Sequence, residues 1–246
     1  MAIKRFAAIA DTTITNAFSA NSGLQTRATG SNMGLADSLE VYSVYGRASS
    51  SFGSGQSAEL SRILIKFPVT TTDDSANSIQ AKRTSGEIPA SGSVSFYLKM
   101  YNVAHANTLP VGAKMNVFAV SRSWEEGRGV DLDTYTDKTY DNVGSNWINA
   151  SSSYKWLRPG GDYHTGSAAG DLNSIIMYSQ TFPSGSEDLD VDITHLVERW
   201  IRASGATNED EGYTNYGVGV FLTASYESYF SSSTGEDLPE IPPNPI

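Results

Sequence analysis

The chain has 246 residues, and at the usual size of about 150 residues per domain this corresponds to one large domain or two modest ones. Its 39% hydrophobic and 18% charged content is typical of a folded globular chain and excludes a disordered one. The net charge of −10 disfavours nucleic-acid and anionic-membrane partners, because like charges repel. Zero cysteines exclude disulfides, cysteine nucleophiles and thiolate metal sites.

The first ten residues have a basic start, but their apolar run is too short for a signal-peptide core. No later stretch approaches the roughly 18 apolar residues that a membrane-spanning helix needs. We therefore expect a soluble protein made without an export address and with no membrane partner.

Period-two alternation of apolar and polar residues predicts eight strands. In chain order they cover residues 8–16, 39–45, 63–67, 94–100, 115–120, 174–181, 189–193 and 216–222. Stretches rich in Ser, Gly, Thr and Asn separate them, notably 46–56 and 78–93, and these predict turns and surface loops.

One segment, residues 194–203, has the pattern of a helix. Four apolar side chains share one face of it: Leu196, Val197, Trp200 and Ile201. Asp192 or Thr194 can cap its first turn, and Gly205 can end it. One short helix among many strands predicts an all-β fold, a jelly-roll-like antiparallel β-sandwich with a helix near residues 194–203.

We expect the sandwich to occupy residues 1–230 and a Pro-rich tail or linker to occupy residues 231–246. The last eight residues hold four of the nine prolines, which favour an extended chain over a packed core. Three apolar side chains of this tail are candidates for docking on a neighbour: Leu238, Ile241 and Ile246.

The residue pattern gives no support to an enzyme, so we expect no catalytic residues and no cofactor. The three histidines, His105, His164 and His195, are far apart and lack paired-ligand spacing. The stretch from Gly53 to Ala58 imitates a dinucleotide-binding motif, but it lies in a Ser/Gly-rich loop instead of between a strand and a helix.

Two acidic runs could supply carboxylate oxygens to a metal ion. Asp131, Asp133 and Asp137 are candidate ligands for calcium, although the run is no EF-hand, because Thr136 stands where that loop requires Gly. The second run, Asp188, Asp190 and Asp192, is predicted to be one solvated face of a strand that ends in a helix cap.

Four aromatic residues gather in one polar, Gly/Ser-rich stretch: Trp147, Tyr154, Trp156 and Tyr163. Exposed aromatic faces stack on sugar rings or anchor protein interfaces, so the group is a candidate for partner or glycan binding. The alternative is a long loop that its own aromatics pin to the sandwich. The sequence leaves both open.

The order of several short motifs resembles the DNRLRE domain family over roughly residues 6 to 226. The motifs are Ala10-Asp-Thr-Thr-Ile-Thr-Asn16, Asn32-Met-Gly34, Leu39-Glu-Val41, Leu60-Ser-Arg-Ile-Leu-Ile-Lys-Phe67, Ser123-Trp-Glu-Glu-Gly127, Ser145-Asn-Trp147, Asp190-Val-Asp-Ile-Thr-His-Leu-Val-Glu-Arg-Trp200 and Tyr216-Gly-Val-Gly-Val220. The family consists of jelly-roll sandwiches of bacterial surface proteins and carbohydrate-binding modules. The versions in tailed-phage structural proteins are most similar.

The resemblance implies a non-catalytic adhesive or structural module in which Asp11 and Arg62 support the fold. The chain departs from the family by its acidic and aromatic material between Gly127 and Ser174 and by the missing export signal, which favours a particle assembled in cytoplasm. We therefore expect a virion structural protein of a tailed phage.

Its expected role is that of an accessory or decoration protein on the capsid or tail exterior that contacts other virion proteins. We expect it to be a homo-oligomer, and the resemblance to virion proteins favours a trimer. The alternative is a carbohydrate-binding module of a cell-surface or secreted protein, which would bind glycan.

Overall fold

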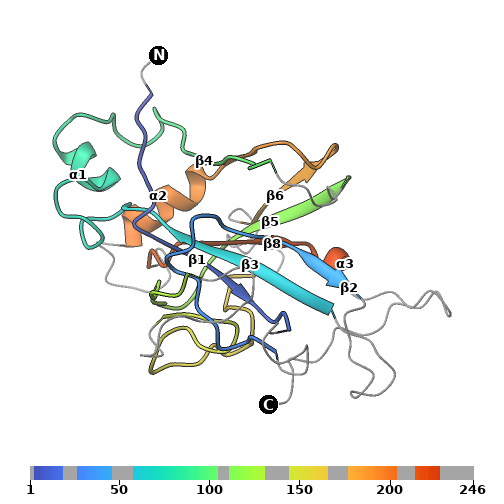
Figure 1. Ribbon diagram of the computed structural model, residues 1–246. Helices are drawn as coiled ribbons and strands as arrows, with labels where there is room; N and C mark the ends of the chain where they lie inside the picture. Colours follow the sequence, from blue (N-terminus) through green and yellow to red (C-terminus); the bar gives the residue numbers. More distant parts are fainter. Residues whose placement is uncertain are drawn as a thin grey trace, which may run out of the picture.

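The computed structural model describes residues 3–18, 27–45, 58–104, 111–130, 144–165, 177–203 and 214–227. Antiparallel β-structure dominates them and forms two sheets, with a few short helices (Figure 1). The predicted all-β antiparallel sandwich is confirmed. Within these ranges no helix is long and apolar enough to cross a membrane.

The larger sheet has the order β1-β3-β8-β5-β6. Its members are β1 (Ala10–Thr15), β3 (Ala58–Lys66), β8 (Val218–Leu222), β5 (Ala113–Ala119) and β6 (Met177–Phe182). A sixth strand, β2 (Ser43–Tyr45), pairs with the first three residues of β3. All five residues of β8 are buried, because this strand lies between β3 and β5 in the middle of the sheet.

The smaller sheet pairs β4 (Tyr97–Met100) with β7 (Leu189–Asp192), and Leu98 stands opposite Val191. The Gln180 side chain on β6 joins the two sheets. Its amide donates to the Asp188 carbonyl at 2.8 Å and accepts from the Asp190 N–H at 2.8 Å. A side chain thus takes the place that a backbone ladder would have between β6 and β7.

The main core lies between these sheets and α2 (Thr194–Ala203). Ile63 and Ile65 of β3 contribute to it from one face of the large sheet, as alternation requires. On α2 the predicted apolar face packs against this core: Leu196, Val197 and Trp200 are at most 2% exposed, and Ile201, the fourth predicted member, is partly buried. Asp192 accepts a hydrogen bond from the Thr194 N–H at 2.9 Å and so caps the first turn, which was one of the two predicted caps.

Each of the eight predicted strands has a counterpart, and the predicted helix has the predicted bounds. Two short helices were not expected: α1 (Ile79–Thr84), inside a stretch predicted as loop, and α3 (Ala224–Glu227). The Ser78 hydroxyl caps α1 by accepting from the Ala81 N–H at 3.2 Å, and Ile79 is its one buried residue. So small an apolar face leaves no helical periodicity to detect.

Candidate functional site

The opposite face of the large sheet is covered by the segment 144–165, which has little regular structure. Together with residues of the sheet it forms a second core cluster of six buried residues: Ile14, Leu64, Val120, Trp147, Ala150 and Trp156. Leu64 lies between Ile63 and Ile65 in sequence but faces this second cluster. The large sheet therefore has apolar cover on both faces.

Arg62 lies beside this second cluster and is the centre of its polar contacts. Its Nε donates to Glu227 Oε1 at 2.9 Å and one terminal nitrogen to Glu227 Oε2 at 2.6 Å. The other terminal nitrogen donates to the Gly160 carbonyl at 2.9 Å. The guanidinium carbon also lies 4.9 Å from the Phe221 ring centroid and 5.3 Å from that of Trp147. Arg62 thus joins β3, α3 and the segment 144–165.

The charge states around Arg62 are fixed by this environment. Burial works to lower the pKa of Arg62, but the neighbouring Glu227 and Tyr163 outweigh it and raise the pKa above its ordinary value. Burial raises the pKa of Tyr163 to about 12, and the Tyr163 hydroxyl donates to the Gly160 carbonyl at 2.9 Å. Arg62 therefore stays charged and Tyr163 stays neutral over the whole physiological range, as suits groups that hold a structure.

Asn32 is a second polar centre, and it holds the segments on either side of residues 131–143. Its amide nitrogen donates to the carbonyls of Glu126 at 2.7 Å and Ser145 at 2.8 Å. Its amide oxygen accepts from the N–H groups of Gly34 at 3.2 Å and Gly129 at 2.8 Å. All four hydrogen bonds of the side-chain amide are made, so Asn32 is fully used in structure.

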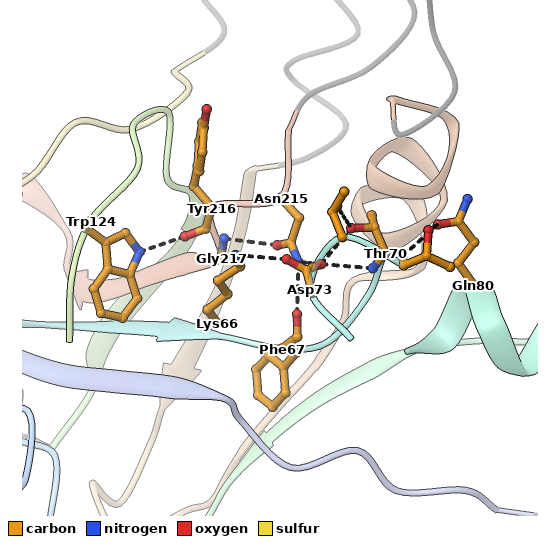
Figure 2. A network of polar contacts seen from close by, with 11 residues as sticks. Lys66, Phe67, Thr70, Asp73, Gln80, Trp124, Asn215, Tyr216 and Gly217 are labelled. Carbon is orange, nitrogen blue, oxygen red and sulfur yellow. Dashed lines mark hydrogen bonds and ion pairs between the residues drawn. The ribbon is translucent and has the colours of Figure 1, made fainter. Parts of the chain in front are cut away.

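Asp73 is the third centre, and Figure 2 shows it within its network. It pairs with Lys66 Nζ at 2.8 Å and accepts from the Thr70 N–H at 2.9 Å, the Thr70 hydroxyl at 2.8 Å and Asn215 Nδ2 at 2.8 Å. Asn215 in turn accepts from the Gly217 N–H at 3.0 Å. The loop after β3 is thereby tied to the chain that enters β8.

Burial also acts on the acidic groups of the fold. It works to raise the pKa of Asp73, but hydrogen bonds from Lys66, Thr70 and Asn215 outweigh it and hold the pKa below its ordinary value. In Asp11, burial raises the pKa of the carboxyl, and the Asp11 N–H donates to Glu126 Oε1 at 2.9 Å. Asp11 and Arg62 thus both lie at contacts between β-strands and loops.

The four aromatic candidates differ in how far their side chains are exposed. Trp147 and Trp156 are 6% and 5% exposed, and Trp156 Nε1 donates to the Asn146 carbonyl at 2.8 Å. Tyr163 is partly covered and bonded as described, whereas Tyr154 is 69% exposed. Trp147 and Trp156 therefore offer no open ring face to a sugar. For them the alternative of a loop pinned by its own aromatics describes the structure.

The acidic runs are divided too. Asp131, Asp133 and Asp137 lie outside the described residues, as do His105 and the tail residues Leu238, Ile241 and Ile246. In the ranges that are described, no group of three or more His, Asp or Glu side chains is placed to hold a metal ion.

Asp188, Asp190 and Asp192 form the solvated face that was predicted, with Leu189 and Val191 buried on the other side. Asp190 pairs with Lys99, and Asp188 accepts from the Asn102 N–H at 2.8 Å.

Of the histidines, His195 is exposed on α2, and burial lowers the pKa of the His164 imidazole.

The sequence did not point to the partners of Arg62 or to the roles of Asp73 and Asn215. For Asn32 the sequence held one indication, the glycines at positions 127 and 144, which lie against its side chain. A Cβ on Gly127 or Gly144 would lie 2.2 or 2.4 Å from the Asn32 side chain, and both have positive φ. Each is a position where only glycine allows the close approach.

Comparison with protein-family models, with curated proteins and with solved structures finds no match to this chain. The resemblance to the DNRLRE family therefore stays a prediction.

Proposed function

We propose that the protein is a non-enzymatic virion structural protein of a tailed phage, an accessory or decoration protein on the exterior of the capsid or tail. The observation that carries this proposal is how Arg62, Asn32 and Asp73 are used. Each uses its buried hydrogen-bonding groups to join segments that are distant in the sequence. That is the chemistry of a scaffold that must keep its shape while its surface binds.

The use of the aromatic residues supports the same proposal. Trp147 and Trp156 fix the segment 144–165 to the sheet, so an irregular layer gains a core of its own. A surface segment that is already fixed suits a protein that acts by binding, because ordering a mobile loop on binding costs affinity. The resemblance to phage structural proteins and the acidic, cysteine-free composition agree with it.

The carbohydrate-binding alternative keeps one of its four aromatic residues at the surface, Tyr154. A single exposed tyrosine gives little stacking area for an oligosaccharide, so we do not propose this function. It remains distinguishable by a glycan array. Loss of array binding in Tyr154→Ala, with an unchanged melting curve, would restore it above the virion proposal.

The direct experiment is a search for the chain in purified phage particles. We expect mass spectrometry of gradient-purified particles to detect it and immunogold labelling to place it on their exterior. Deleting residues 236–246 should leave the sandwich folded but weaken incorporation, if Leu238, Ile241 and Ile246 dock on a neighbour. Particles that lack the chain at every stage of assembly would overturn the proposal.

A further inference from the structure

The chain has a net charge of −10, but one part of the segment 144–165 exposes two cations beside two large apolar side chains. We define the cationic tip as four residues with exposed side chains: Tyr154, Lys155, Leu157 and Arg158. Tyr154 and Leu157 are 69% and 78% exposed. Within the described parts of the chain neither Lys155 nor Arg158 has an ion-pair partner. Large apolar side chains exposed side by side are typical of an interface, and the two cations beside them favour an acidic partner surface.

Buried groups beneath the surface fix the backbone of the cationic tip. Trp156, in its middle, is buried and hydrogen-bonded. The Asp162 carboxylate accepts from the N–H groups of Leu157 at 2.9 Å and Arg158 at 3.1 Å, and it pairs with Arg122 at 3.0 Å. The backbone of the tip is therefore fixed before any partner arrives, which lowers the entropy that docking would cost.

A surface of the opposite character covers the outer side of the small sheet. We define the acidic tyrosine face as Tyr97, Tyr101, Asp188, Asp190 and Asp192, all with exposed side chains. Tyr97 stands opposite Asp192 and Lys99 opposite Asp190, so these side chains share the outward face. Three carboxylates outnumber the one lysine there. Tyr97 and Tyr101 are 55% and 70% exposed.

The two surfaces lie toward opposite ends of the molecule. In Figure 1 the yellow segment that contains residues 150–165 is at the bottom, and β4 is at the top. The tip therefore does not meet the face of its own chain, and a contact between them requires two copies.

We propose that the chain self-associates head to tail, with the cationic tip of one copy docked on the acidic tyrosine face of the next. Lys155 and Arg158 meet the aspartates, and Tyr154 and Leu157 pack against Tyr97 and Tyr101. The occupant is a second copy because both complementary surfaces belong to this chain, and because copies that each carry −10 need a local attraction to offset their repulsion. Such a contact is heterologous, so it closes into a ring or grows as a filament. It does not depend on the virion proposal.

A charge-swap experiment on the purified full chain tests this interface. The tip variant carries Lys155→Glu and Arg158→Glu, and the face variant carries Asp188→Lys and Asp190→Lys. We expect the wild-type chain to associate in sedimentation velocity at low salt and to dissociate as salt rises, since the pairs are at the surface. Each variant alone should associate at least roughly tenfold more weakly, because tip and face then carry like charge.

Mixing the two variants is the decisive arm. An acidic tip then meets a basic face, and a basic tip meets an acidic face, so association should return. A matched control carries Arg5→Glu and Lys114→Glu, which change the net charge as the tip variant does at exposed positions outside both surfaces. It should associate much as the wild type does, apart from the added repulsion.

Three results would overturn the proposal: a wild-type chain that stays monomeric up to millimolar concentration, variants that associate as the wild type does, or a mixture that shows no recovery. Circular dichroism of each variant separates loss of the interface from loss of the fold. Because no particle is involved, the outcome is independent of whether the chain is found in virions.

Discussion

Arg62 and Glu227 are 165 positions apart in the sequence and meet in a two-point ion pair, with donor–acceptor distances of 2.9 and 2.6 Å. The pair joins the middle of β3 to the end of α3. Both side chains are mostly buried, at 17% and 13% exposure. A planar guanidinium fits a carboxylate with two parallel hydrogen bonds, a geometry that lysine cannot reproduce.

Glu227→Gln should lower the free energy of unfolding by about 3 kcal/mol, because it leaves the Arg62 charge mostly buried and without its counter-ion. Urea unfolding followed by tryptophan fluorescence measures this. The exposed pair of Lys99 and Asp190 supplies the control, and Asp190→Asn should cost less than about 1 kcal/mol. Equal effects in the two variants would contradict the structural role given to Arg62.

Asp73 should make stability depend on pH in the acid range. Its pKa in the folded protein is held below the unfolded value of about 3.9. Such a carboxyl contributes its stability above the unfolded pKa and loses it as the pH falls through the folded pKa. Asp73→Asn should therefore be less stable than wild type at pH 7, by about 2 kcal/mol for lost charged hydrogen bonds.

The difference between Asp73→Asn and wild type should shrink as the pH falls below about 4, because the unfolded carboxyl is protonated there and the folded carboxyl follows at a lower pH. Urea midpoints at pH 7, 5 and 3 give the comparison. A difference that is the same at pH 7 and pH 3 would show that Asp73 acts by shape instead of charge.

Gly127→Ala should destabilise the protein more than Gly86→Ala. Both glycines have positive φ, +86° and +77°, so each substitution strains the backbone by about 1 to 2 kcal/mol. At Gly86 nothing lies within 4 Å of the added Cβ, whereas at Gly127 the Asn32 side chain lies 2.2 Å away. The excess in Gly127→Ala, measured by thermal unfolding, is the cost of displacing Asn32. Equal melting temperatures would mean that Asn32 moves freely.

Trp200→Ala should lower the free energy of unfolding by about 3 to 5 kcal/mol, the usual range for removing a buried aromatic side chain. Trp200 is 1% exposed, and its indole N–H has no hydrogen-bond partner among the described residues. Trp200→Phe should cost less, because it keeps most of the ring and removes the unpaired donor. Denaturant unfolding ranks the two, and a larger loss in Trp200→Phe would contradict this packing.

The strands and α2 could be predicted because each leaves a local pattern. In β7 the alternation of Leu189 and Val191 with Asp190 and Asp192 marks both faces, and on α2 the spacing of Leu196 and Trp200 marks one. The structure keeps these patterns because both elements cover the main core with one side only.

The candidate site could not be predicted in the same way, because its partners are distant in sequence. Nothing near Glu227 indicates Arg62, and nothing near Asp73 indicates Asn215. The burial of Trp147 and Trp156 was hidden by polar neighbours, since local composition does not tell whether a loop folds back onto a sheet. The sequence favoured neither an exposed nor a buried position for the four aromatic residues, because long-range packing decides which of them are covered.

The place of β8 in the large sheet has a consequence for how the protein is made. Among the described strands it is the last to leave the ribosome, yet it lies between β3 and β5. Until residues 218–222 emerge, the β1–β3 and β5–β6 hairpin-like pairs each keep an open edge, and open edges invite pairing with other chains. The two open edges close only when one short buried strand is inserted between its two neighbours, so the last described strand of the chain completes the large sheet.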